Sequence, residues 1–112
     1  RRPKVMDMST GVQTKEEVFK TLSDHSAQLK DLGVKKVGLF GSFVRGEQTP
    51  ESDIDLLVQF ESGKKTFDNF MHLAGLLEDL LQHRVEIITP EALSPYIGPH
   101  ILSEVEYARL SA

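Results

Sequence analysis

The sequence predicts one small α/β (α+β) domain in which helices pack on a mixed sheet. Three short segments, 34–40, 53–60 and 84–89, are rich in the aliphatic and β-branched residues that strands favour. Longer segments with apolar residues at helical spacing lie before, between and after them. The predicted order is helix, strand, short helical turn, strand, helix, strand, helix. A chain of 112 residues has the usual length of one domain.

The first predicted helix begins with a capping box and ends at a glycine. Thr14 is followed three residues later by Glu17, so their side chains can satisfy backbone N–H groups of the first turn. Apolar residues then recur on one helical face, and Gly33 supplies a C-terminal stop. We expect one continuous helix over residues 15–32.

The remaining helices follow the strands. Residues 42–46 form a helical turn, and residues 66–82 have the apolar spacing of an amphipathic helix. Thr89 should cap another short turn that has Pro90 at its first position. A final helix is predicted over about residues 99–110. We expect these helices to pack on one face of a small sheet.

Composition limits the class of function. Residues 1–13 lack a periodic pattern and are expected to form a flexible N-terminal arm, which precedes a domain over residues 14–112. The absence of cysteine excludes disulfides, thiolate metal sites and cysteine nucleophiles. A net charge of -4 without a basic stripe argues against direct binding of nucleic acid. No apolar run is long enough to span a bilayer, so we expect no membrane contact and a cytoplasmic location.

A short motif carries the predicted chemistry: Gly41-Ser42, ten intervening residues, and then Asp53-Ile54-Asp55. Gly41 has no side chain, so the backbone there can approach a phosphate closely. Ser42 adds a hydroxyl where the N–H groups of a helical turn favour an anion. Taken singly, each could be an ordinary turn or capping residue, but the combined spacing favours a nucleotide site. We expect both to hold the β- and γ-phosphates.

The two aspartates of this motif point to a metal ion. They lie two positions apart in a predicted strand, so both side chains leave the same face. Two carboxylates that close repel each other unless a cation holds them. Mg²⁺ is usually bound by one or two carboxylates together with substrate phosphates. We therefore predict that Asp53 and Asp55 bind two Mg²⁺ ions against a nucleoside triphosphate.

Two further residues are candidates for the same site. Glu86 lies in the third predicted strand, between Val85 and Ile87, and can reach the metals if this strand neighbours the second one. It would then act as a third ligand or as general base for an acceptor hydroxyl. Arg45 either binds triphosphate oxygens or is an ordinary surface arginine.

Residues 38–46 read Gly-Leu-Phe-Gly-Ser-Phe-Val-Arg-Gly, and residues 52–58 read Ser-Asp-Ile-Asp-Leu-Leu-Val. With the ending over residues 93–104, these segments resemble the minimal nucleotidyltransferases of the DNA polymerase-β superfamily. The resemblance covers most of the chain and implies a polymerase-β-type fold, Mg²⁺ and ATP. In that family the third acidic position is more often Asp, whereas this chain has Glu86.

Many members of that family are antitoxins paired with an HEPN-domain RNase, which they inactivate by transferring AMP to one of its tyrosines. The resemblance implies that this chain is such an antitoxin, with an HEPN toxin as its partner. A second hypothesis is a non-catalytic antitoxin that inhibits its partner by binding. A third is nucleotidyl transfer to a small molecule. The acceptor surface is expected from a partner or from a second copy of the chain.

Overall fold

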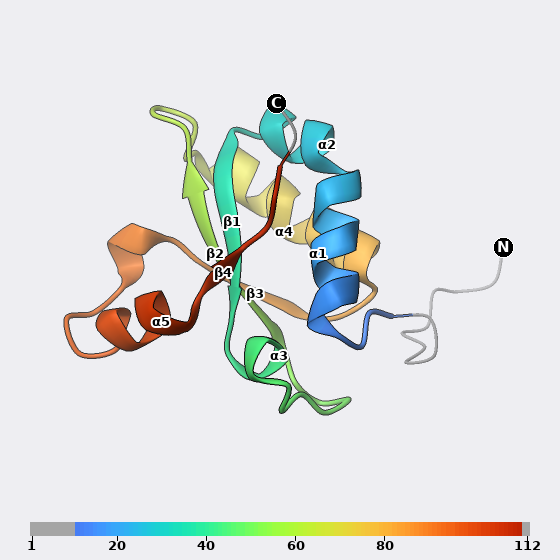
Figure 1. Ribbon diagram of the computed structural model, residues 1–112. Helices are drawn as coiled ribbons and strands as arrows, with labels where there is room; N and C mark the ends of the chain where they lie inside the picture. The colour runs from blue at the N-terminus through green and yellow to red at the C-terminus, as the bar shows by residue number, and fades with distance from the viewer. Residues whose placement is uncertain (1–10, 111–112) are drawn as a thin grey trace, which may run out of the picture.

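The structure is a computed structural model that describes residues 11–110. A four-stranded sheet with strand order β3-β2-β1-β4 forms its centre (Figure 1). The strands are β1 (Val34–Phe40), β2 (Ile54–Phe60), β3 (Val85–Ile88) and β4 (Glu106–Tyr107). Strand β1 pairs antiparallel with β2 and β4, whereas β2 and β3 are parallel. The predicted mixed sheet is thus confirmed, and β4 is a strand that the sequence did not predict.

The first helix differs from its prediction. Two helices, α1 (Lys15–Asp24) and α2 (Ser26–Asp31), replace the expected continuous one. They meet at His25, whose backbone N–H donates to the Leu22 carbonyl and whose ring Nδ1 lies 2.9 Å from the Thr21 carbonyl oxygen. These bonds to the last turn of α1 end it there. The predicted capping box of Thr14 and Glu17 is confirmed.

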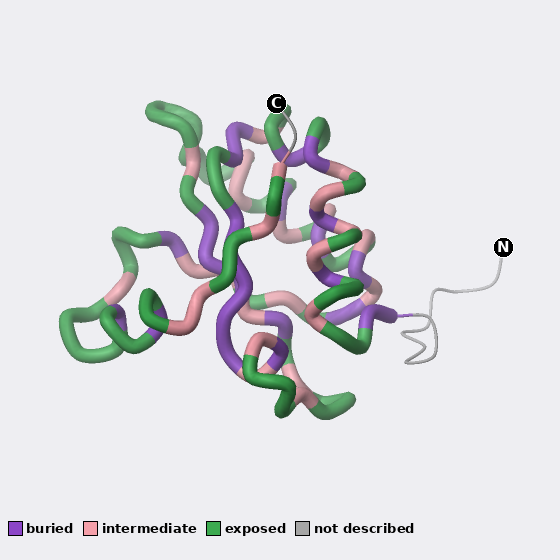
Figure 2. The backbone as a smooth tube through the Cα atoms, viewed as in Figure 1, coloured by how far each residue is buried: buried purple, intermediate pink, exposed green. Residues whose placement is uncertain are grey.

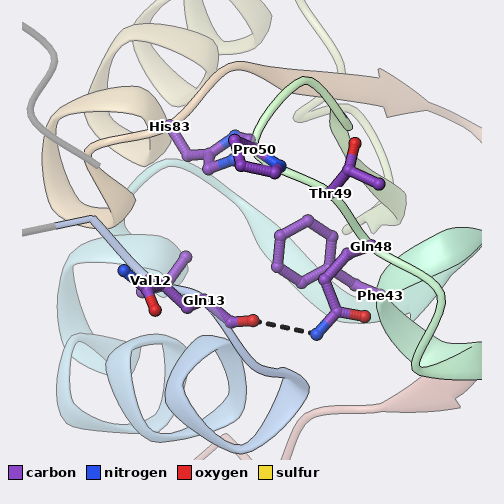
Figure 3. A pocket seen from close by; sticks show the side chains of 7 residues that line it. All are labelled: Val12, Gln13, Phe43, Gln48, Thr49, Pro50 and His83. Atoms are coloured by element: carbon purple, nitrogen blue, oxygen red, sulfur yellow. Dashed lines mark hydrogen bonds between the residues drawn. The ribbon is translucent and has the colours of Figure 1, made fainter. Parts of the chain in front are cut away.

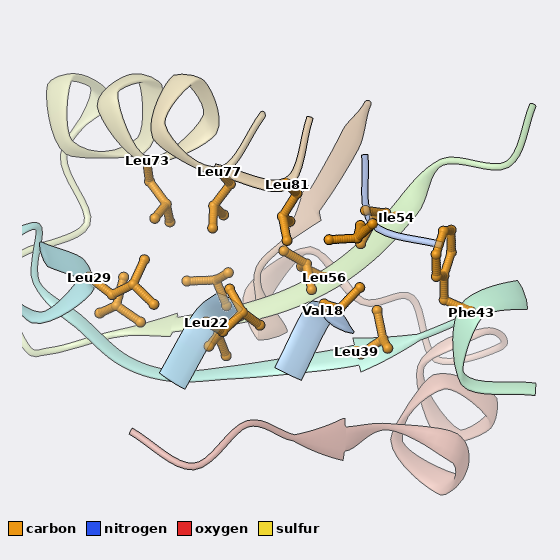
Figure 4. Packing of buried hydrophobic residues seen from close by; sticks show 14 residues of the cluster. Val18, Leu22, Leu29, Leu39, Phe43, Ile54, Leu56, Leu73, Leu77 and Leu81 are labelled. Atoms are coloured by element: carbon orange, nitrogen blue, oxygen red, sulfur yellow. The ribbon is translucent and has the colours of Figure 1, made fainter. Parts of the chain in front are cut away.

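The main core lies between one face of the sheet and the helices α1, α2 and α4 (Phe67–Leu81) (Figure 4). Strand β2 alternates, so Ile54, Leu56 and Val58 face these helices and are completely buried. Figure 2 shows the buried segments gathered along the sheet and the helices that cover it. The buried side chains of this core include Val18, Leu22, Leu29, Ile54, Leu56, Val58, Leu73, Leu77 and Leu81. Each buried aliphatic side chain contributes about 2 kcal/mol. This packing makes β2 a rigid support.

Contrary to the expectation, the second face of the sheet is also covered. The short helix α5 (Gly98–Glu104) packs there through Ile101, which contacts the small cluster of Phe40 and Leu57. The reason is that β1 and β2 carry apolar residues on both faces, so both faces need cover. The predicted helix over residues 99–110 is wrong beyond Glu104, because Val105 is extended (φ -64°, ψ 137°) and leads into β4.

Smaller elements close the fold. The predicted helical turns exist as α3 (Ser42–Arg45) and as a 3₁₀ turn (Pro90–Ala92), although the Thr89 side chain makes no capping hydrogen bond.

Of the expected N-terminal arm, residues 1–10 lie outside the described residues. Val12 is buried in the main core and its N–H donates to the Leu81 carbonyl. None of the described helices is both long and apolar enough to span a membrane.

Candidate active site

Strand β1 is followed by a glycine that lies directly against a carboxylate of β2. Gly41 has φ 82° and ψ -153° and is the N-cap residue of α3. A Cβ atom at this position would collide with Oδ2 of Asp55. A side chain is therefore excluded twice, by the positive φ and by the contact. The turn that the sequence assigns to phosphate binding thus lies next to the acidic strand.

Asp55 and Glu86 are opposite each other on neighbouring parallel strands. Strand alternation places both on the second face of the sheet, the face of Leu57 and Ile88. Burial, the charges of Glu86 and Asp53, and a hydrogen bond with the Glu86 carboxyl raise the pKa of Asp55 to about 6. The prediction that the strand of Glu86 lies beside the strand of Asp55 is therefore confirmed.

Asp53 is exposed and lies one residue before β2. Its Oδ1 lies 3.1 Å from Nε of Arg84, with which it forms an ion pair. The Asp53 charge still acts on Asp55, since it is one cause of the raised pKa of Asp55. The sequence predicted Asp53 as a metal ligand and did not anticipate its arginine partner.

The acidic residues have the oxygen donors that Mg²⁺ prefers, but their three carboxylates do not converge on one position. Asp53, Asp55 and Glu86 offer only carboxylate oxygens, the donors that Mg²⁺ prefers. Burial and, to a smaller extent, the charges of Glu86 and Asp53 raise the pKa of Asp55, and a divalent cation would offset both effects. Within residues 11–110, no three His, Asp or Glu side chains converge as a preformed metal site. Asp53 would have to leave Arg84 to join the other two carboxylates.

Arg45, at the end of α3, binds two carboxylates. Its Nε lies 2.9 Å from Oε1 of Glu47, and its Nη1 lies 3.0 Å from Oε1 of Glu104. The Glu104 carboxylate also accepts a hydrogen bond of 2.8 Å from the Gly41 N–H. Burial alone would raise the pKa of Glu104, but the Gly41 N–H and the Arg45 guanidinium hold it below its usual value.

Glu104 was missed in the sequence analysis, which placed it inside a longer helix. Ser42, in contrast, lies where the motif predicts, as the first residue of α3, and it is partly exposed. Among the described residues, none hydrogen-bonds its hydroxyl. The hydroxyl is therefore available to a ligand, and it lies on the turn that Gly41 holds against Asp55.

A pocket of about 230 Å³ lies on the core side of α3 (Figure 3). Phe43 and His83 line it, with their rings in an edge-to-face contact at 5.5 Å, and Gln48 closes one side by donating to the Gln13 carbonyl. None of the six residues assigned to the site from sequence lines this pocket. It is therefore separate from the acidic face of the sheet.

Comparisons with known proteins show the family of the chain. The nucleotidyltransferase domain family matches residues 22–110. The protein adenylyltransferase MntA of Thermococcus cleftensis is 39% identical over 95 residues, which are 84% of this chain and 95% of that protein. A solved structure described as a candidate minimal nucleotidyltransferase has a TM-score of 0.65 at 35% identity, and the match covers 79% of this chain and 93% of that chain.

A more distant likeness concerns a complex of two proteins. The structure of tri-AMPylated Shewanella oneidensis HEPN toxin with MNT antitoxin contains a chain that matches with a TM-score of 0.57. The identity is 17%, and the match covers 83% of this chain and 73% of that one. At this identity the likeness concerns the fold alone.

The mixed sheet, with a Gly-Ser turn beside a strand carboxylate and a second carboxylate in register, has the arrangement expected of a nucleotidyltransferase. The chain belongs to the nucleotidyltransferase domain family and is an enzyme of the minimal type. This confirms the family resemblance that residues 38–58 indicate.

Proposed function

We propose that this chain is a cytoplasmic antitoxin that transfers AMP from ATP to a tyrosine hydroxyl of an HEPN RNase toxin. The observation that carries the proposal is the close approach of Gly41 to Asp55, which supports a phosphate-binding role for this turn beside the acidic strands. The name of the Thermococcus cleftensis relative supports AMP as the transferred group. The shared fold with a chain of the AMPylated HEPN toxin complex supports a protein acceptor.

In this proposal Asp53 and Asp55 would hold two Mg²⁺ ions together with the triphosphate, and Glu86, opposite Asp55, is left to act as general base. Bound there, Mg²⁺ supplies Lewis-acid polarisation of the α-phosphate and neutralises the charge of the leaving pyrophosphate. The oxygen-only donor set and the raised pKa of Asp55 support this assignment.

The phosphate-binding residues lie on and beside α3. Gly41 would set the course of this turn, because its positive φ and its close approach to Asp55 are open only to glycine. The Ser42 hydroxyl would donate to a phosphate oxygen, and the Arg45 guanidinium would bind a second one. Together they would orient the triphosphate so that pyrophosphate departs opposite the incoming hydroxyl.

The chemical step is a displacement at phosphorus. The oxygen of the acceptor hydroxyl forms a bond to the α-phosphorus of ATP. The bond from this phosphorus to the bridging oxygen breaks, and its electron pair leaves with pyrophosphate. Glu86, which is exposed, would take up the proton of the hydroxyl as general base.

The test uses ATP labelled at the α-phosphate, Mg²⁺ and a purified HEPN toxin as acceptor. We expect label on the toxin with the unchanged chain and almost none with Asp55→Asn. Asp31→Asn is the matched control, because Asp31 is an exposed aspartate at the end of α2, outside the site. Replacement of the modified tyrosine by phenylalanine should remove the label.

The competing hypothesis is inhibition by binding alone. It predicts that Asp55→Asn still protects cells from the toxin and that the toxin carries no AMP. Protection by the unchanged chain without any label on the toxin would refute the transfer proposal. Loss of both label and protection in Asp55→Asn, with both retained in Asp31→Asn, would support it.

A further inference from the structure

One carboxylate holds both ends of α3. Glu104, the last residue of α5, accepts a hydrogen bond from the N–H of Gly41, the N-cap residue of α3, at 2.8 Å. Its two oxygens also accept from Nη1 of Arg45, the last residue of α3, at 3.0 and 3.2 Å. The Glu104 side chain is only 15% exposed, and its contact with the Gly41 N–H is partly buried, whereas its contacts with Arg45 are exposed.

The register of the sheet explains this arrangement. Leu39 pairs with Glu106 in the antiparallel ladder of β1 and β4. Two residues further along β1, the same ladder would place Gly41 opposite Glu104. The backbone there is helical, however, so the Glu104 side chain supplies the acceptor that a strand carbonyl would otherwise provide. Gly41 is thereby fixed on one side by Glu104 and on the other by the contact with Asp55.

A helix of four residues needs such support. One turn of helix is unstable alone, because its nucleation fixes several dihedral angles for very few hydrogen bonds. Hydrogen bonds to an ionised group are roughly twice as strong as neutral ones. Here two partners of one carboxylate lie at opposite ends of the turn that carries Ser42.

We propose that Glu104 is a positioning residue for nucleotidyl transfer. It fixes the Ser42 hydroxyl and the Arg45 guanidinium at the places where they meet the triphosphate, without touching the reacting atoms itself. This rests on the proposed function, since it takes the phosphates to bind at α3. It also gives the C-terminal segment an effect on nucleotide binding that acts through α3.

The experiment compares Glu104→Ala and Glu104→Gln with Glu106→Gln as matched control. Glu106 lies two residues further along, is exposed and pairs with Lys15 at 3.2 Å rather than with Gly41 or Arg45. Glu104→Gln keeps an oxygen that can accept from Gly41 but removes the negative charge at Arg45. Three quantities are measured: amide hydrogen exchange at Gly41, the Kd for Mg-ATP, and the separate KM and kcat of AMP transfer.

For Glu104→Ala we expect faster exchange of the Gly41 amide and a KM and Kd for ATP raised about tenfold, with a smaller change in kcat. Glu104→Gln should restore slow exchange at Gly41 and part of the ATP affinity. Glu106→Gln should match the unchanged chain. A purely structural role would instead lower the active fraction, which reduces kcat and leaves KM unchanged.

Unchanged ATP affinity in a folded Glu104→Ala variant would overturn the positioning role. If Glu104→Ala does not fold, Glu104→Gln tests the positioning role instead. A KM for ATP in Glu104→Gln equal to that of the unchanged chain would then overturn that role. Failure of the unchanged chain to bind Mg-ATP would refute the proposed function and the positioning role together. Exchange at Gly41 would still report whether Glu104 holds the turn, so the two failures are distinguishable.

Discussion

The guanidinium of Arg84 holds the carboxylate of Asp53, with Nε 3.1 Å from Oδ1. Arg84 also donates to the backbone carbonyl of Glu51, in the loop that precedes β2. Asp53, which the motif assigns to a metal ion, is thus paired with the positively charged side chain of Arg84. Mg²⁺ and Arg84 should therefore compete for Asp53.

Replacement of Arg84 by Gln tests this competition. We expect the Kd for Mg²⁺, measured in the presence of ATP, to fall about two- to fivefold, because an exposed ion pair is worth below about 1 kcal/mol. The free energy of unfolding should change by less than about 1 kcal/mol. Lys20→Gln is the control, since it removes another exposed pair, Lys20–Asp24 at 2.9 Å, far from the site in sequence. A weaker Mg²⁺ affinity in Arg84→Gln would contradict the competition.

The raised pKa of Asp55 predicts how stability depends on pH. Burial and the neighbouring Glu86 and Asp53 raise the pKa to about 6 from an ordinary 3.8. The folded state therefore binds this proton more tightly than the unfolded state. Stability from this group is complete below about pH 3.8 and is lost as the pH rises through about 6. After allowance for partial exposure, the loss is on the order of 1 kcal/mol.

Asp55→Asn should consequently be more stable than the unchanged chain at about pH 7 and equal to it at about pH 4, in urea unfolding without divalent ions. Mg²⁺ at neutral pH should raise the Tm of the unchanged chain and not that of the variant, because a bound cation stabilises only the ionised site. Asp31→Asn should show neither effect. Lower stability of Asp55→Asn at neutral pH would show that Asp55 is not under electrostatic strain.

Gly41→Ala should lower both the stability and the transfer activity far more than a glycine-to-alanine change outside the site. The positive φ and the contact with Asp55 together should cost about 2 kcal/mol or more and displace the turn from the carboxylate. Gly75→Ala is the matched control: Gly75 lies exposed in α4 with nothing near its missing Cβ, so alanine should stabilise by about 0.5–1 kcal/mol. Thermal unfolding and transfer assays measure both. Normal activity in Gly41→Ala would refute the close-approach argument.

The centre of the site could be predicted from sequence because its signals are local. Gly41 and Ser42 follow one strand, Asp53 and Asp55 flank the first residue of the next, and the ten residues between Ser42 and Asp53 hold the rest of α3 and a loop. The position of Glu86 followed from one assumption, that the second and third strands are neighbours, and the register confirms it.

The parts that could not be predicted depend on contacts between distant residues. The carboxylate of Glu104 and the N–H of Gly41 are 63 positions apart, and no periodic pattern joins them. Strand β4 has only two residues, both exposed, so it lacks the alternation that marks a strand. The break at His25 contains neither Gly nor Pro, and it depends on how the side chain bonds back to α1.

The alternation of β2 has a consequence for changes in chain length. Asp55 faces the acidic side only because its neighbours Ile54 and Leu56 face the core. One residue inserted or deleted before Asp55 within this strand would turn each following side chain to the opposite face of the sheet. A leucine would then lie on the acidic side, and the carboxylate of Asp55 would face the helices. The loops at the strand ends can accommodate a change in length without this effect, whereas the strand itself tolerates neither an insertion nor a deletion of one residue.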